Sequence, residues 1–179
     1  MTLMRALPGL PALAVVLATA ASPAAAQDDV QTFNAFAVVT ANGTIVRAAE
    51  KQAVAVATLA GPFFIETGEG PIPSGDVACA ASMRADHATH RLTGSGACMF
   101  TAHDGATAWG SWDCAGYELV GCRGIFKLAG GTARLAGATG EATMIWRPSA
   151  HEFRKQLDGT TIDNAAGIVL WRDFKLKGN

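Results

Sequence analysis

The sequence contains few charged residues and no excess of either sign. Asp, Glu, Lys and Arg make up 16% of the chain, and the formal net charge at pH 7 is −1. Proteins that collect nucleic acid or anionic lipid through their surface field carry a basic excess. The composition therefore predicts no nucleic-acid partner and no electrostatic attachment to a lipid surface.

Sustained helical periodicity and the common catalytic motifs are also missing. No long stretch repeats its apolar residues every 3.6 positions, which argues against an amphipathic helix. The sequence has no phosphate-binding loop, no dinucleotide fingerprint and no Gly-x-Ser-x-Gly nucleophile motif. We therefore expect no cofactor, and the sequence leaves open whether the protein is an enzyme.

No apolar run is long enough for a transmembrane helix, but a shorter one lies near the N-terminus. Arg5 precedes an apolar run from Leu10 to Ala21, and Ala24-Ala25-Ala26 follows immediately before Gln27. This order is typical of a signal peptide, whereas a membrane-spanning helix needs roughly 20 apolar residues. We predict a signal peptide at residues 1–26, cleaved after Ala26. The mature chain, residues 27–179, would be a single periplasmic or secreted domain without stable membrane insertion.

The mature sequence consists of short alternating runs separated by turn residues. Turn signals recur about every 8–12 residues, which is typical of an all-β sandwich or barrel. Asn42-Gly43 and Asp104-Gly105 each predict a two-residue hairpin, Gly61-Pro62 predicts a strand break, and residues 67–76 predict a loop. Gly94 and Gly96 lie within a strand, where glycine permits coiling or close contact. The expected strands are 33–40, 44–48, 52–60, 63–66, 77–84, 92–101, 107–114, 122–128, 141–147 and 166–176.

Four cysteines, an even number in a chain predicted to be exported, indicate disulfides. Residues opposite each other in a hairpin have a constant sum of residue numbers. Cys79 and Cys98 are symmetric about the polar turn 86–91, and Cys114 and Cys122 about the turn 115–121. We therefore predict the bonds Cys79–Cys98 and Cys114–Cys122, each between directly opposed residues. The spacings do not resemble the close cysteine pairs of a zinc site.

Residues 130–140, Gly-Gly-Thr-Ala-Arg-Leu-Ala-Gly-Ala-Thr-Gly, form the most distinctive run. The run resembles the Gly-Gly-Thr-Gly-Arg-Phe-x-Gly-Ala-x-Gly segment of the allene oxide cyclase-like and dirigent-like β-barrels. The resemblance covers roughly Cys98 to Pro148 and departs from the pattern at Ala133, where the family usually has Gly. We expect Ala133 to change the backbone of the turn slightly, and Arg134 to hold the loop by bonding carbonyls.

The resemblance implies a single antiparallel barrel of about eight strands, with an apolar cavity open at one end. Some members of the family bind a reactive small molecule and direct its cyclisation or coupling. The acidic and asparagine catalytic positions of the family lie in segments that cannot be matched here residue by residue. No catalytic residue is therefore carried over.

Three side chains are candidates for a ligand pocket inside such a barrel. Alternation places Ile168, Leu170, Arg172 and Phe174 on one face, so Arg172 would be a cation on an apolar face. The other interpretations of Arg172 are an outward side chain in a shifted register, or a structural ion pair. Trp112 and Trp146 are the other candidates, although tryptophan in a small β-protein usually belongs to the core.

The histidines offer a weaker possibility. His87 and His90 lie three residues apart in a polar turn, and His103-Asp104 lies in another turn. A metal site needs further ligands at the right distance, and solvated loops explain these residues better. We therefore predict no metal site.

Three functions remain possible for the predicted barrel. The first is an exported barrel that binds an apolar or amphipathic small molecule, and the second is a cofactor-free isomerase or cyclase. The third is a structural or interaction protein with a filled interior. A cavity lined by Trp112, Trp146 and Arg172 would favour the first two, and a solid interior the third.

Overall fold

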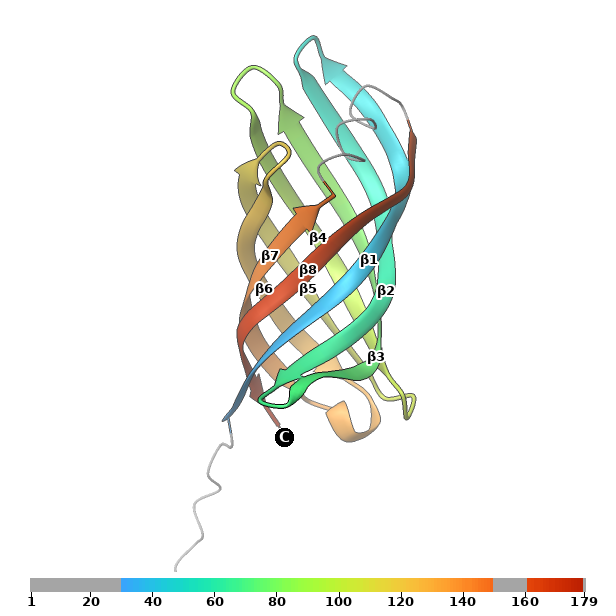
Figure 1. Cartoon of the computed structure of the whole chain (residues 1–179), viewed down its shortest axis with the longest axis vertical. Coiled ribbons are helices and arrows are strands. Elements are labelled where there is room, and N and C mark those ends of the chain that lie inside the picture. Colours follow the sequence, from blue (N-terminus) through green and yellow to red (C-terminus); the bar gives the residue numbers. More distant parts are fainter. Residues whose placement is uncertain (1–29, 150–160, 179) are drawn as a thin grey trace, which may run out of the picture.

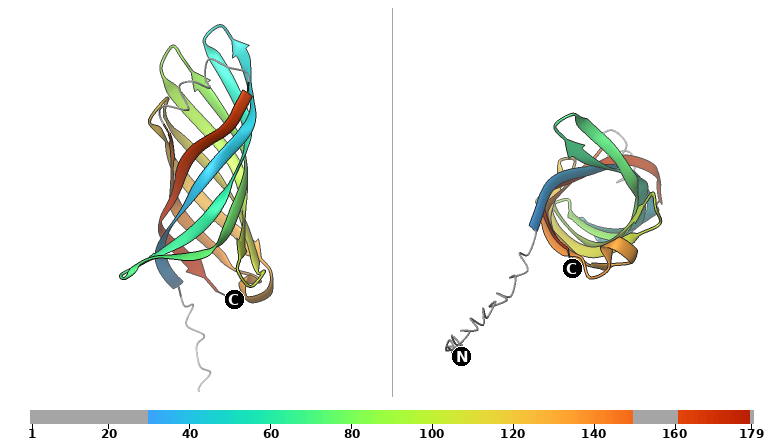
Figure 2. Two further views of the ribbon diagram at one scale, coloured as in Figure 1. Left: turned by 45° about the vertical axis from the view of Figure 1, so that its right-hand side comes forward. Right: turned by 90° about the horizontal axis from the view of Figure 1, so that it is seen from below.

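Eight antiparallel strands, each paired with the next in sequence, form a closed barrel in the computed structural model (Figure 1). The structure describes residues 30–149 and 161–178. The first and last strands pair with each other and close the ring, which is visible along the barrel axis in Figure 2. The predicted all-β fold is therefore confirmed. The strands are β1 Val30–Ala49, β2 Gln52–Thr67, β3 Gly70–Asp86, β4 Arg91–Ala102, β5 Thr107–Tyr117, β6 Gly121–Gly131, β7 Thr139–Pro148 and β8 Thr161–Lys177.

The two ends of the barrel differ in the connections they carry. The upper end in Figure 1 has the short turns β1–β2, β3–β4 and β5–β6. The lower end has the turns β2–β3 and β4–β5, together with a 3-10 helix, Ala133–Leu135, between β6 and β7. The predicted signal peptide, residues 1–26, lies outside the described residues. Within the described residues, no helix combines the length and the apolar character needed to cross a membrane.

An aromatic cluster fills the barrel interior near its middle. Phe63, Phe100, Phe126 and Trp171 form this cluster, with ring centroids 5.0–6.2 Å apart and mostly edge-to-face contacts. Phe126 and Trp171 are fully buried. The indole N–H of Trp171 has no hydrogen-bond acceptor among the described residues. Edge-to-face aromatic pairs add about 0.5–1.5 kcal/mol each to the effect of burial, so the cluster is a major stabilising contact.

Asn42-Gly43 does not form the predicted hairpin. Both residues lie inside β1, where Asn42 pairs with Thr58 and Gly43 with Ala57 of β2. A Cβ atom on Gly43 would lie 2.1 Å from the carbonyl oxygen of Val56, so glycine serves close strand contact here. The Asn42 side chain accepts a hydrogen bond from the Asn164 N–H at a register shift between β1 and β8. The dipeptide therefore belongs to an irregularity in the sheet, and its turn propensity is overridden by pairing on both sides.

The predicted break at Gly61-Pro62 and the predicted loop 67–76 are also wrong. β2 continues through Pro62, and the turn between β2 and β3 contains only Gly68 and Glu69. The first residues of β3, before Gly75, extend beyond β4 and pair with β2 alone. A strand segment with one free edge tolerates proline because the missing N–H faces no partner. Merging these pieces turns the ten expected strands into eight.

Both predicted disulfides are present. Cys79 and Cys98 are directly opposite each other in the β3–β4 pairing, as predicted. Cys114 and Cys122 are not: Cys114 is opposite Gly124, and the bond crosses the β5–β6 pair diagonally. The reason is that Tyr117 pairs with Gly121, so the turn is centred on Leu119 and not on the predicted position 118. Two disulfides indicate an oxidising, extracytoplasmic setting.

The aromatic cluster gives a test of the fold that uses two residues of one type. Trp171→Ala removes a fully buried indole and should lower the free energy of unfolding by about 3–5 kcal/mol. Trp109→Ala removes an indole that is 43% exposed on the outer surface and should cost much less. Denaturant unfolding of both variants checks this. Equal losses for the two variants would contradict the position of Trp171 inside the barrel.

Candidate functional site

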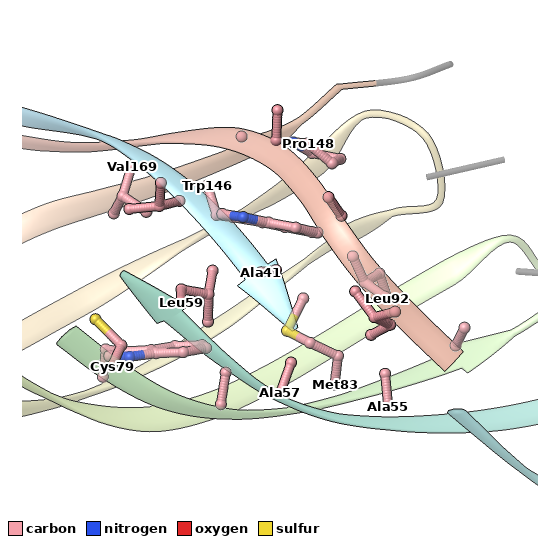
Figure 3. Close-up of a pocket in the computed structure, with 18 of the residues that line it drawn as sticks. Ala41, Ala55, Ala57, Leu59, Cys79, Met83, Leu92, Trp146, Pro148 and Val169 are labelled. Atoms are coloured by element: carbon pink, nitrogen blue, oxygen red, sulfur yellow. The ribbon is translucent and has the colours of Figure 1, made fainter. Parts of the chain in front are cut away.

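The upper half of the barrel contains an apolar cavity, called the upper cavity below (Figure 3). The cavity has a volume of about 70 Å³. Its walls come from all strands except β6, and every lining residue is apolar. Among the lining side chains are Val39, Leu59, Met83, Leu92, Trp112 and Trp146. A site with this lining excludes polar ligands, because their lost hydrogen bonds to water would find no replacement.

Small side chains on β2 and β3 leave this space open. Ala57 and Ala81 are cross-strand neighbours, and both line the upper cavity. Ala53 and Ala85 form a second such pair nearer the turns. An alanine at an inward position ends at Cβ, so the opposite wall does not reach it and a void remains.

Glycines in β4 make room for Trp112. Gly96 is directly opposite Trp112, and a Cβ atom at Gly96 would lie 2.7 Å from the indole ring. A Cβ atom at Gly94 would lie 3.3 Å from the same ring. The expectation that these glycines serve close contact is confirmed. The indole lies flat against β4 and is almost completely buried.

Trp146 forms another part of the upper cavity wall. The residue is on β7, partly buried, with its side chain reaching between Leu59 and Pro148 in Figure 3. Trp112 and Trp146 therefore both line one cavity, as the sequence predicted for a barrel pocket. Their role in binding a ligand stays a prediction.

Arg172 does not line the upper cavity. Its guanidinium lies 2.5 Å from the carboxylate of Glu66, and both side chains are about one-third exposed. The Asp173 residue has φ of 52°, and the β7–β8 register shifts just before Thr143, which pairs with Arg172. Before this irregularity, the inward side chains of β8 stand at odd positions, Val169 and Trp171. After it, the inward side chain is at an even position, Phe174. The predicted face containing Ile168, Leu170, Arg172 and Phe174 is therefore wrong, and Arg172 forms an ion pair across β1.

The histidines of the β3–β4 turn contact a carboxylate that the sequence did not single out. Glu118, in the β5–β6 turn, lies 2.5 Å from His87 Nδ1 and 3.1 Å from His90 Nδ1. The His90 contact is a hydrogen bond, and the Glu118 N–H also donates to the His90 carbonyl. No group of three possible metal ligands occurs among the described residues. These contacts join two neighbouring turns at the upper end.

A second cavity, the lower cavity, lies on the other side of the aromatic cluster. The lower cavity has a volume of about 440 Å³. Phe63 and Phe100 of the aromatic cluster line it, together with Phe33, Leu128, Leu135 and Phe174. The order along β8 shows the separation: Val169 lines the upper cavity, Trp171 belongs to the aromatic cluster, and Phe174 lines the lower cavity. Sequence reasoning missed this cavity because it expected one opening.

Arg134 and Asp104 meet at the lower end. Arg134 Nε lies 2.5 Å from Asp104 Oδ2, and Asp104 Oδ1 accepts a hydrogen bond from the Ala106 N–H. The Arg134 hydrogen bond, followed by that from Ala106, lowers the pKa of Asp104 below its ordinary value of 3.8. Arg134 therefore bonds a carboxylate, not the carbonyls expected from the sequence. Ala133 has φ of 50°, so it adopts the left-handed conformation for which glycine is preferred.

No protein-family model, no curated protein and no solved structure matches this chain. The structure thus supports an eight-stranded antiparallel barrel without placing the chain in a family.

The Asp104–Arg134 contact predicts a specific pH dependence. Because the folded-state pKa of Asp104 is lowered, the contact stabilises the protein above about pH 3.8 and is lost as the pH falls through the folded-state value. Asp104→Asn keeps an acceptor for the Ala106 N–H but removes the charge. We expect this variant to unfold at a lower temperature than the parent protein at pH 7, with the difference shrinking under acid.

Thermal unfolding between pH 2 and pH 7 measures that difference. Asp113→Asn is the matched control, because Asp113 is an exposed carboxylate on β5 with no ion-pair partner among the described residues. A gap between parent and Asp104→Asn that stays constant across this range would contradict the prediction.

Proposed function

We propose that this protein is an exported β-barrel that binds a small apolar molecule in the upper cavity. The observation that carries the proposal is a cavity inside the barrel whose lining residues are all apolar. An apolar cavity stays free of ordered water and takes up apolar ligands at little desolvation cost. Export is supported by the two disulfides and by the signal-peptide pattern before Gln27, and we place the protein in the periplasm or outside the cell.

The size of the cavity limits the ligand. An engineered cavity of about 150 Å³ lined by aliphatic and aromatic side chains binds benzene or xenon. The upper cavity, at about 70 Å³, is about half as large, so it suits xenon, a ligand no larger than benzene, or the apolar end of a longer molecule. Trp112 and Trp146 would supply most of the aromatic surface, and Met83 a side chain that adapts to ligand shape.

The lining favours binding over a cyclase-type reaction. Such a reaction develops charge, and an enzyme lowers its barrier with preorganised donors or charged groups. The residues that line the upper cavity contain no ionisable side chain. The run 130–140, which carries the family resemblance, lies at the lower end and does not border this cavity. The resemblance therefore adds nothing to the chemistry of the upper cavity.

Blocking the cavity from inside tests the proposal. Ala81→Leu places a larger side chain in the upper cavity, whereas Ala80→Leu makes the same change on the outer face of β3. Benzene should raise the unfolding temperature of the parent protein and of Ala80→Leu, but not of Ala81→Leu. A ligand at 100 times its Kd stabilises the folded state by about 2.7 kcal/mol.

The measurement is thermal unfolding with and without benzene, with density for xenon in pressurised crystals as an independent readout. Absence of both a benzene effect and xenon density in the parent protein would refute the proposal. An equal benzene effect in Ala81→Leu would place the binding site elsewhere and refute it too.

A further inference from the structure

We propose that the lower cavity is a separate binding site for an amphipathic anion, with its charged group on Arg134 and its apolar body on the phenylalanines. The volume of about 440 Å³ falls within the range of about 300–1,000 Å³ typical of small-molecule sites. The lining combines apolar rings with one guanidinium and four uncharged polar residues, Gln31, Thr32, Ser74 and Thr101. The site differs from the upper cavity in both size and chemistry, so the inference does not rest on the function proposed above.

The apolar part of the site is built from aromatic rings at two levels. Phe63 and Phe100 line the inner part, where their centroids lie 5.0 Å apart in an edge-to-face pair. Phe33 and Phe174 stack with centroids 5.0 Å apart, one on each of the two strands that close the barrel. Ring edges and faces of this kind accept alkyl or aryl groups, and burial of such a group drives binding.

Arg134 is the cation of the lower cavity lining. Asp104 holds its guanidinium through Nε, the atom that a ligand at the terminal nitrogens would not use. Its Nε atom donates to Asp104, whose other oxygen is held by the Ala106 N–H. The two terminal nitrogens of Arg134 have no hydrogen-bond partner among the described residues. A guanidinium bound through Nε keeps these terminal donors for a second anion, and bidentate contact with a carboxylate is the geometry they favour.

The turn that carries Arg134 is tied to its neighbour. The Thr107 N–H donates to Thr132 Oγ1, and the Thr132 N–H donates to the Thr107 carbonyl. Thr132 directly precedes the 3-10 helix that contains Arg134. These bonds connect the β6–β7 turn to the start of β5, on which Ala108 also lines the cavity. Arg134 therefore lies in a turn that hydrogen bonds hold against β5 at the cavity.

An anion fits this site better than a cation. The only ionisable side chain that lines the lower cavity among the described residues is Arg134. The hydroxyl of Ser74, another polar lining group, is already bonded to the carbonyl of Ile72. Because Arg134 is exposed to solvent, its attraction for an anion will weaken with added salt.

Calorimetric titration with octanoate and 1-octanol separates the two parts of the site, because both share one alkyl chain and only octanoate is charged at neutral pH. In the parent protein, octanoate should bind about tenfold more tightly than octanol, the factor expected for one charge-assisted contact near 1.4 kcal/mol. This advantage should fall as NaCl rises. Arg134→Met should remove it, and Arg134→Lys should restore part of it.

Two controls locate the site. Arg84→Met removes an exposed cation of β3 and should leave octanoate affinity unchanged, as should Ala81→Leu, which fills only the upper cavity. Octanoate binding no tighter than octanol in the parent protein overturns the proposal without any variant. Loss of octanoate binding in Ala81→Leu also overturns it, since the ligand would then occupy the upper cavity. If Ala81→Leu still binds octanoate but benzene no longer raises its unfolding temperature, the result supports a separate binding site in the lower cavity.

Discussion

Closure of the sheet after eight strands fixes the width of the interior, and the division into filled and open regions depends on that limit. A barrel of this size has room for its own side chains or for one small ligand. Space therefore remains only where inward side chains are small. Trp171 and three phenylalanines fill the middle, and alanines line part of the upper half. The size of each inward residue, rather than any motif, decides where a ligand fits.

Local turn propensity predicted most connections but failed where strands have partners on both sides. Asp104-Gly105 is a turn as expected, whereas Asn42-Gly43 lies within the longest strand. The difference is pairing: Asn42 has backbone partners in β2, and Gly43 in both β2 and β8. A preference of about 1 kcal/mol for a turn does not outweigh hydrogen bonds along two neighbouring strands. Sequence alone does not show that pairing, because β8 lies more than a hundred residues away.

Strand irregularities that the sequence does not reveal also limited the prediction of site residues. Trp112 was recognisable because strict alternation holds along β5, so its inward direction could be counted from neighbouring positions. The alternation of β8 is interrupted next to Asp173, which has a positive φ that no sequence rule assigns to aspartate at this place. A single irregularity exchanges the inward and outward directions of all later side chains in the strand. Arg172 was misplaced for this reason, and Arg134 was seen only as part of a loop.

The first disulfide ties these elements together. Cys79 and Cys98 both line the upper cavity, and the next inward residue of β4, Phe100, belongs to the aromatic cluster. Because the bond joins two inward side chains, it is compatible only with pairings that turn Ala81 and Phe100 inward as well. A slip of one residue would exchange the inward and outward sets of β3. The cross-link therefore holds the inward set of β3 and β4 at the boundary between the filled middle and the open upper half.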